Sequence, residues 1–216
     1  MPDLMTPPPA GPPAGAGKPP AGPGQDHGLG PAHDAAASAG LLARLERRDR
    51  AVSAVIAGRW PHPRWFTVPL GAVSLTGNYG IVWFVLAVAG AAVGPAVFSG
   101  RRFVYVAGAV LATEWITFGV KLVFRRRRPP ERDPGGKTHI PLPLSPSFPS
   151  SHASMSVVGA LTMSVLYPHL WPAFAALALV LAASRVYLRV HFLADVLAGV
   201  CLGLALGLPY IALVRI

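Results

Sequence analysis

Three short segments of this chain carry side chains that could bind a phosphate group and react with it. In chain order they are Lys121-x6-Arg128-Pro129, Pro149-Ser150-Ser151-His152 and Ser184-Arg185-x5-His191-x3-Asp195. Guanidinium groups bind phosphate oxygens through paired hydrogen bonds, and histidine can act as a covalent nucleophile. All three segments adjoin apolar runs, where charged side chains are costly and often mark a functional site. We therefore expect the three segments to form one site.

His191 is the candidate nucleophile of this site. If a helix begins at about Val190, His191 and Asp195 lie one turn apart on the same face, and the carboxylate can hold one ring nitrogen. The other ring nitrogen can then attack phosphorus and form a phosphohistidine. Asp195 would fix the tautomer of the ring and stabilise its positive charge. His152 would protonate the leaving oxygen and then deprotonate the attacking water.

The remaining motif residues can surround the phosphate oxygens. Lys121, Arg128 and Arg185 would offset the negative charge that spreads over those oxygens in the transition state. Ser150 and Ser151 stand where a helix should begin, so their backbone N–H groups can hold a further oxygen. With these donors in place, the proposed chemistry needs no metal and no other cofactor.

Other charged residues close to the motifs have simpler interpretations. A basic run at the end of an apolar segment is usually a cytoplasmic flank that sets topology, and we favour this interpretation for Arg125, Arg126 and Arg127. Glu114 lies seven residues before Lys121 and so on the same helical face. It is either a buried hydrogen-bond partner for neighbouring helices or a support for the basic cluster, and both interpretations stay open.

Taken together, the three segments resemble the type 2 phosphatidic acid phosphatase family, membrane lipid phosphatases that share a histidine mechanism with the vanadium haloperoxidases. The resemblance covers about residues 110 to 200 and implies, for the matched positions, the same roles that the residue chemistry indicates. The chain departs from the family pattern at Ser151, where glycine is more common. Serine there either narrows the approach of the backbone to a ligand or adds a hydroxyl donor.

The composition favours a membrane protein with an anionic lipid partner. Apolar residues make up 52% of the chain and charged residues 13%, while the formal net charge is +10. In a soluble protein this basicity would suggest a nucleic-acid partner, but arginines beside apolar segments attract lipid headgroups instead, so no nucleic acid is expected. The single cysteine, Cys201, excludes a disulfide within the chain and is predicted to be a core residue.

The pattern along the chain predicts an all-α fold, a polytopic membrane helical bundle with about five transmembrane helices. Residues 1–38, rich in Pro, Gly and Ala, should form a disordered tail, and residues 39–216 a membrane-embedded phosphatase domain. Residues 41–60 mix apolar residues with arginines, as an amphipathic helix in the headgroup layer does. Residues 66–78 are predicted to be a half-buried connector. The predicted spans are about 79–99, 103–124, 152–169, 171–188 and 192–213.

This order of spans brings the motifs to one face of the membrane. Residues 125–151 and 186–191 emerge on the same side, while the tight turn at 168–172 lies on the other. Arginines near the N-terminus favour a cytoplasmic site, whereas the family often has an outward-facing site. The orientation therefore stays open. The proline-rich linker 130–148 either gates lipid headgroups or is a plain surface loop.

The favoured function is that of a metal-independent integral membrane phosphatase acting on a phosphorylated membrane lipid. The substrate would be a polyprenyl or phosphatidyl phosphate or pyrophosphate, and the Ala, Arg and Pro usage suggests a bacterial plasma membrane. One alternative is a non-catalytic lipid-binding membrane protein in which the histidines only cap helices. A second is a haloperoxidase-like use of the pocket with bound vanadate, which the apolar spans disfavour. The sequence leaves the oligomeric state and the exact substrate open.

Overall fold

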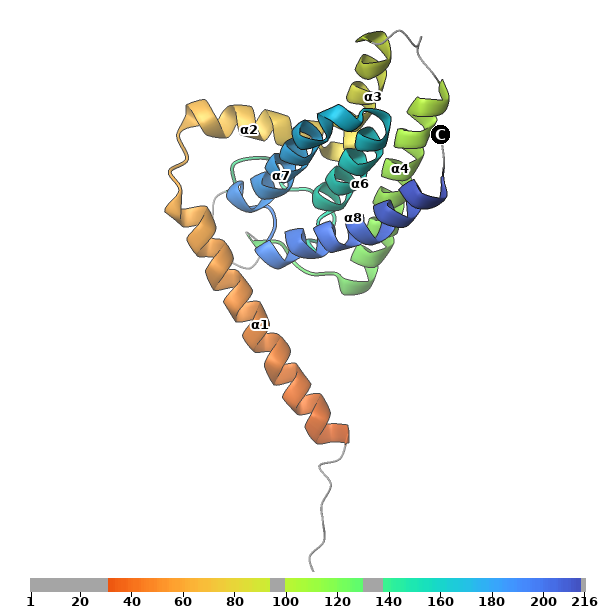
Figure 1. Cartoon of the computed structure of the whole chain (residues 1–216). Helices are drawn as coiled ribbons and strands as arrows, with labels where there is room; N and C mark the ends of the chain where they lie inside the picture. Colours follow the sequence, from red (N-terminus) through yellow and green to blue (C-terminus); the bar gives the residue numbers. More distant parts are fainter. Residues whose placement is uncertain (1–30, 94–99, 130–137, 215–216) are drawn as a thin grey trace, which may run out of the picture. The chain divides into compact units, whose positions relative to one another are not determined.

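A computed structural model of the chain describes residues 31–93, 100–129 and 138–214. By its internal contacts the chain divides into Met1–Gly40 and Leu41–Ile216, and the features discussed below belong to the second part. Every regular element in the described ranges is helical, which confirms the all-α prediction. The elements are α1 Pro31–Arg59, α2 Arg64–Thr76, η1 Asn78–Gly80, α3 Ile81–Val93, α4 Gly100–Phe124, α6 Ser151–Leu166, η2 Pro168–Leu170, α7 Trp171–Tyr187 and α8 Leu193–Leu213 (Figure 1).

Helix α1 begins earlier than the sequence predicts. It starts at Pro31, seven residues before the predicted limit of the tail at residue 38. Residues 1–30 lie outside the described ranges, so the disorder of the tail stays a prediction. Alanine-rich residues follow Pro31, and alanine has the highest helix propensity of all residues. From Leu41 onward the helix exposes leucines, valines and arginines, and it buries Ser53 and Ala57. Its position in the headgroup layer stays a prediction.

Residues 66–78, predicted to be a connector, form most of a helix instead. Helix α2 contains Pro69 and is followed directly by η1 and α3. The chain bends by 62° between α2 and the segment that begins at Asn78. The bend falls at Gly77, where a Cβ atom would lie 2.8 Å from Cδ2 of His152. The absence of a side chain at Gly77 therefore lets the bent backbone pass directly over a motif histidine.

The described residues leave the predicted number of about five spans unconfirmed. In the described ranges, three helical segments are long and apolar enough to cross a membrane: α4, η2 together with α7, and α8. The bent pair of α2 with η1 and α3 would add a fourth if it counts as one span. The predicted span 152–169 corresponds to α6, which has 16 residues and is about 24 Å long at 1.5 Å per residue. The chain turns at Tyr167 and Pro168, as the predicted hairpin requires.

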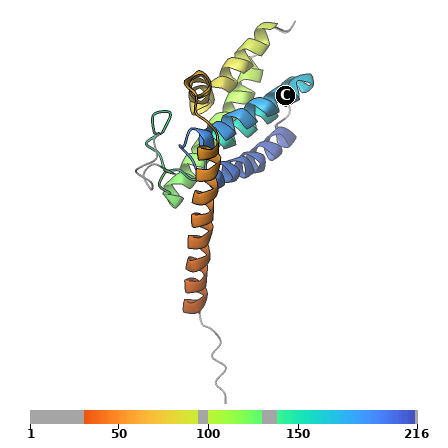
Figure 2. The same cartoon turned by 90° about the vertical axis from the view of Figure 1, so that its left-hand side faces the viewer.

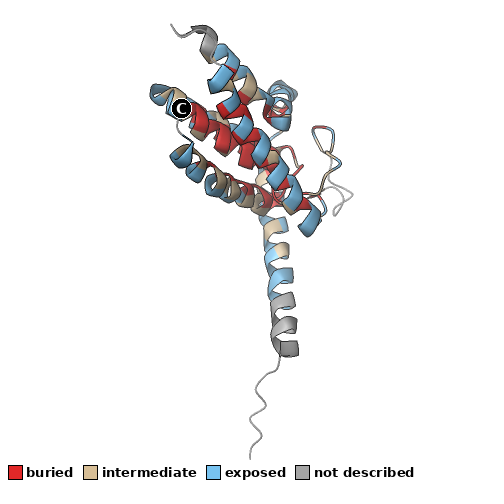
Figure 3. Ribbon diagram, turned by 90° about the vertical axis from the view of Figure 1, so that its right-hand side faces the viewer, coloured by how far each residue is buried: buried red, intermediate tan, exposed pale blue. Residues whose placement is uncertain are grey.

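Helix α6 is the central helix of the bundle. Helices α4, α7 and α8 all pack against it (Figure 1), and most of its residues are buried, as the red colouring of the inner helices indicates (Figure 3). Helix α8 places glycines at positions 199, 203 and 207 against α6, and a Cβ atom at Gly203 would lie 2.7 Å from the carbonyl oxygen of Ser154. Small residues at this spacing let membrane helices approach closely.

The outer surface of the bundle is apolar. Large exposed side chains on it include Val104, Leu111, Trp115, Leu179, Leu197, Leu204 and Leu208. An exposed apolar surface of this extent is typical of contact with a membrane. Cys201 is exposed as well, so the prediction that it is a core residue is wrong. It lies two residues from Gly199, about 200° around the helix, and therefore points away from α6.

Candidate active site

The three motifs meet at one end of the bundle, as the predicted order of spans requires. The last turns of α4 and α7 carry Lys121 and Arg185, and the first turns of α6 and α8 carry His152 and Asp195. Arg128, Ser150 and His191 lie in the segments that adjoin these helices. Residues 138–150 lie beside the end of α4 (Figure 2). A cavity of about 730 Å³ opens among them. The motif residues that line it are Lys121, Arg128, Ser151, His152, Arg185 and His191.

A tight turn between α7 and α8 delivers His191 to the cavity. Arg189 adopts a left-handed conformation with φ of 60°, and the backbone N–H groups of Val190 and His191 both donate to the carbonyl oxygen of Arg185, each at 3.1 Å. His191 is 2% exposed, and α8 begins only at Leu193. The predicted helix start at Val190 is therefore wrong, since this turn comes before the helix.

Asp195 still reaches His191 without the predicted shared helical face. Its Oδ2 atom lies 3.6 Å from Nδ1 of His191, which is within ion-pair distance but longer than a hydrogen bond. The same oxygen accepts a hydrogen bond from the backbone N–H of Phe192 at 2.9 Å and a second from the hydroxyl of Ser147. Asp195 is fully buried, so the cap of α8 and the loop before α6 together hold its carboxylate behind the histidine.

The other ring nitrogen of His191 faces the basic residues. Its Nε2 atom lies 3.0 Å from Nη1 of Arg128, and because guanidinium only donates, Nε2 is the acceptor of this hydrogen bond. Burial, and then the charge of Arg128, hold the pKa of His191 well below its usual value. The neutral ring thus presents a lone pair on Nε2, as a nucleophile must.

Lys121 and Arg128 are buried and held by the loop that precedes α6. Nζ of Lys121 donates to the carbonyl oxygen of Pro146 at 2.8 Å. Arg128 donates through Nε to the carbonyl oxygen of Ser145 at 2.9 Å and through Nη1 to that of Val190 at 2.8 Å. These backbone carbonyl oxygens orient both side chains at the cavity.

Arg185 is held from a different direction, by helix α2. Its Nη1 donates to the hydroxyl of Ser74 at 2.8 Å, and the hydroxyl of Ser184 also donates to that oxygen, at 3.1 Å. Ser74 is fully buried, and its carbonyl oxygen lies 3.2 Å from Nε2 of His152. One serine of α2 therefore contacts residues of two motifs.

The two motif serines occupy different positions at the start of α6. Ser151 lines the cavity together with Glu114, whereas Ser150 is fully buried and does not line it. The backbone N–H of Ser150 donates to the carbonyl oxygen of Asp195 at 2.9 Å, so this donor is engaged within the protein, and the role of Ser150 in phosphate binding stays a prediction. Because Glu114 faces the same cavity as Lys121, its position favours support of the basic cluster over a purely structural role.

Arg126 is not the plain basic flank that the sequence suggests. Its guanidinium forms ion pairs with Asp195 at 2.5 Å and with Asp49 of α1 at 2.7 Å, and it stacks 4.4 Å above the ring of Phe192. Its side chain is 11% exposed. Arg125 and Arg127 are exposed, in agreement with their predicted role as a flank.

Several residues of the site could not be found by motif spacing. Ser74 lies in a segment without charged residues, and Asp49 lies in a helix whose arginines dominate the pattern. The carbonyl oxygens of residues 145 and 146 have no side-chain signature at all. For a metal, the described ranges contain no group of three His, Cys, Asp or Glu side chains placed to bind one.

Comparison with known proteins identifies a family and a similar fold. A model of the PAP2 superfamily matches residues 102–215. The fold is similar to a crystal structure of LpxE from Aquifex aeolicus, with a TM-score of 0.63, 22% identity, and coverage of 75% of this chain and 93% of the other. It is also similar to a PAP2-type phosphatidylglycerolphosphate phosphatase from Bacillus subtilis, with a TM-score of 0.58, 23% identity, and coverage of 77% and 84%. No curated protein sequence matches the chain significantly.

Proposed function

Because this chain belongs to the PAP2 superfamily and is a phosphatase of that family, we propose that it hydrolyses a phosphorylated membrane lipid without a metal, through a phosphohistidine. One observation carries the proposal. The neutral Nε2 atom of His191 faces a cavity that Lys121, Arg128 and Arg185 also line. Such a cavity combines a nucleophile with three cations that suit a phosphate dianion.

In the first half of the reaction, Nε2 of His191 attacks phosphorus, and the bond from phosphorus to the leaving oxygen breaks. The ring becomes cationic, and the carboxylate of Asp195 stabilises it near Nδ1. His152 gives its proton to the leaving oxygen. Lys121, Arg128 and Arg185 bind the three equatorial oxygens, whose charge rises as the bond to the leaving group lengthens.

In the second half, His152 takes a proton from water as the water oxygen attacks the phosphohistidine. The bond between phosphorus and Nε2 breaks, inorganic phosphate leaves, and His191 returns to its neutral form. The hydrogen bond from His152 to the carbonyl oxygen of Ser74 orients its ring for both proton transfers. Ser151 offers a further donor at the cavity wall.

A lipid substrate follows from where the cavity lies. The protein is an integral membrane protein, and the cavity lies at the ends of its apolar helices, where a lipid headgroup would meet it. Apolar side chains such as Leu75, Phe118 and Leu122 also line the cavity and would contact the first part of a lipid tail. The two similar structures are those of an LpxE and of a phosphatidylglycerolphosphate phosphatase. We accordingly propose a phosphatidyl or polyprenyl phosphate or pyrophosphate.

The first experiment is phosphate release by the detergent-purified protein with EDTA present, over a panel of phosphatidyl and polyprenyl phosphates and pyrophosphates. We expect release from at least one lipid in EDTA and its loss in His191→Ala. Labelled phosphate should be trapped on the wild type and be absent from the variant. A label on another residue would contradict the role of His191.

Other results of this experiment would support the alternatives. Release from no lipid would favour the non-catalytic lipid-binding protein. Release that stops in EDTA would retain an enzyme but reject this mechanism. Vanadate should inhibit, as a phosphate analogue, and halide oxidation by peroxide in its presence would favour the haloperoxidase-like use of the pocket.

A further inference from the structure

Arg126 connects the candidate orienting carboxylate to a helix outside the matched region. Nη1 donates to Oδ1 of Asp195 at 2.5 Å, and Nη2 donates to Oδ2 of Asp49 at 2.7 Å. The two nitrogens of one planar guanidinium are thus shared between two carboxylates. Because the ring of Phe192 lies 4.4 Å below the guanidinium carbon, the plane of the group is held as well.

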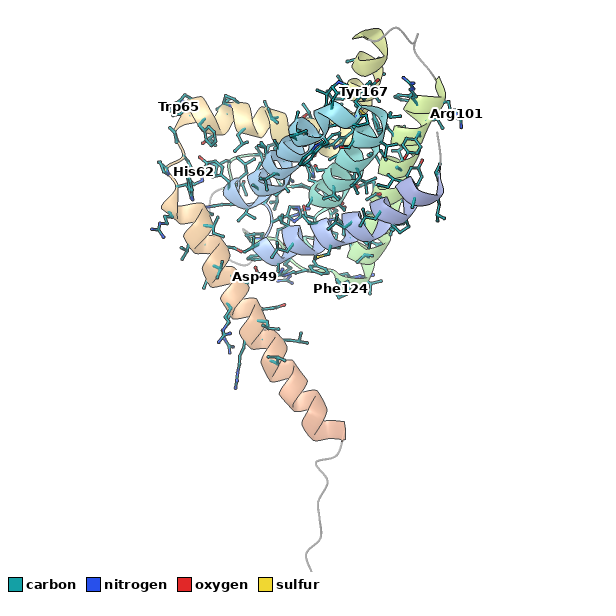
Figure 4. All side chains as sticks on the ribbon, viewed as in Figure 1. Asp49, His62, Trp65, Arg101, Phe124 and Tyr167 are labelled. Carbon is teal, nitrogen blue, oxygen red and sulfur yellow. The ribbon has the colours of Figure 1, made fainter. Side chains whose placement is uncertain are left out.

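Asp49 is itself fixed by the start of α8. Its Oδ1 atom accepts a hydrogen bond from the backbone N–H of Ala194 at 3.0 Å, and Asp49 lies beside this end of α8 in Figure 4. One turn further along α1, the hydroxyl of Ser53 accepts a hydrogen bond from the backbone N–H of Leu193 at 2.9 Å. Helix α1 therefore supplies two side-chain caps to the first turn of α8, which carries Asp195.

The two oxygens of Asp195 are held from opposite sides. Oδ2 accepts from Ser147 and from the backbone of Phe192 and faces Nδ1 of His191, while Oδ1 is bonded to Arg126. The carboxylate is completely buried. Rotation about its last torsion angle would move Oδ2 away from the histidine and Oδ1 away from Arg126 at the same time. The position of Arg126 is thus coupled to the orientation of the carboxylate toward His191.

We propose that Asp49 and Arg126 are positioning residues that act on His191 through Asp195, so that helix α1 contributes to catalysis. The proposal rests on the proposed phosphatase function. Arg126 holds the carboxylate, and Asp49 holds Arg126. Arg126 is distinct from the motif arginines, and α1 lies before residue 102, where the family match begins. The competing interpretation is that the ion pair between Asp49 and Arg126 only holds α1 against the bundle. In that case its loss would leave the rate of the chemical step unchanged.

The test uses full-length protein in detergent and compares steady-state phosphate release by Asp49→Asn and Arg126→Gln with the wild type. We expect kcat to fall at least about tenfold in each variant with KM within about twofold, because small misplacements of catalytic groups can cost up to about a hundredfold. Arg127→Gln removes the same charge from an exposed neighbour and should retain wild-type kcat. Arg126→Lys keeps the charge but not the paired geometry, and should recover only part of the loss.

The decisive comparison places Asp49→Asn in an Asp195→Asn background and measures the residual rate. If Asp49 acts through the carboxylate of Asp195, its substitution should cause no further loss of kcat there. The proposal would be overturned if Asp49→Asn lowered kcat by the same factor in the Asp195→Asn background as in the wild type. It would also be overturned if the activity of the variants fell only in proportion to the fall in their thermal midpoints. Should Arg126→Gln fail to fold, Asp49→Asn carries the test, since it leaves the pair between Arg126 and Asp195 in place.

These outcomes separate the two proposals. A wild type that releases no phosphate from any lipid would contradict the phosphatase function and with it the positioning role. An active wild type that forms phosphohistidine, combined with wild-type kcat in Asp49→Asn, would contradict the positioning role alone.

Discussion

At the scale of single residues, the surroundings of His191 determine its chemistry. The ring is buried, and Arg128 bonds directly to Nε2. Both effects oppose protonation, since a cationic ring would lose hydration and lie against another cation. The same cations that bind phosphate therefore keep the nucleophile in its reactive form. Asp195, at 3.6 Å, then stabilises the charge that appears when phosphorus bonds to the ring.

The lowered pKa of His191 predicts the pH dependence of phosphohistidine formation. The neutral ring is the nucleophile, so a lowered pKa keeps this form populated below pH of about 6.5, where an ordinary histidine becomes protonated. In rapid-quench measurements of labelled enzyme, the rate should hold as pH falls from about 7.5 to 6. A loss of rate with a midpoint near the ordinary histidine value would show that burial and Arg128 do not act as described.

Ser74 provides a second test at this scale. Ser74→Ala removes the hydroxyl that accepts from Arg185, and a hydrogen bond to a charged group contributes about 1.5–3 kcal/mol. We expect KM for the lipid phosphate to rise about tenfold or more, because a misplaced Arg185 binds phosphate poorly. The control is Ser164→Ala, whose hydroxyl bonds only within its own helix, to Ala160, and which should leave KM unchanged. An unaltered KM in Ser74→Ala would remove this serine from phosphate binding.

At the scale of elements, the close contact of α6 with α8 determines where the motifs lie. The glycines of α8 pack against the backbone of α6, so the first turns of the two helices, with His152 and Asp195, come close together. The backbone bond from Ser150 to the carbonyl oxygen of Asp195 ties those two turns directly. Packing of small residues deep in the bundle therefore contributes to the geometry of the site at its end.

Gly203→Ala tests this contact. The added methyl group would lie 2.7 Å from the carbonyl oxygen of Ser154 and 2.8 Å from Cβ of Val157, so α8 must move away from α6. We expect a lower thermal midpoint in detergent and a lower kcat. Gly119→Ala is the matched control, because a Cβ atom there meets nothing within 4 Å and alanine favours helix by about 1 kcal/mol. Equal midpoints for the two variants would contradict the packing argument.

At the scale of the whole molecule, the alternating direction of the helices assigns the ends of the bundle to two sides of the membrane. The cavity lies at the end that carries Leu144, and the turn between α6 and α7, with His169, lies at the other end. Asp49 contacts the start of α8, so this part of α1 belongs to the same side as the cavity. The arginines of α1 then favour a cytoplasmic site.

Thiol labelling of intact cells tests this arrangement and decides the orientation. With Cys201→Ser as the background, we expect Arg50→Cys and Leu144→Cys to behave alike toward an impermeant reagent, and His169→Cys to behave oppositely. A cytoplasmic site requires that only His169→Cys is labelled before lysis. Labelling of Leu144→Cys and His169→Cys from the same side would contradict the arrangement of spans.

The sequence by itself determined the family, the all-α class and the lysine, arginine and histidine residues that line the cavity. These features follow from side-chain chemistry at fixed spacing and from apolar runs, which are local properties of the chain. Lys121, Arg128, His152, Arg185 and His191 were predicted in this way, and the structure brings them together, while their catalytic roles stay proposals.

Only the tertiary structure decided which groups hold these residues in place. The roles of Ser74, Asp49 and Arg126 depend on contacts across 69 to 145 positions of the chain, and spacing within one segment carries no information on such contacts. The start of α8 after His191 and the exposure of Cys201 were decided by packing as well, because the turn at Arg189 and the glycine face of α8 act only once the helices are assembled.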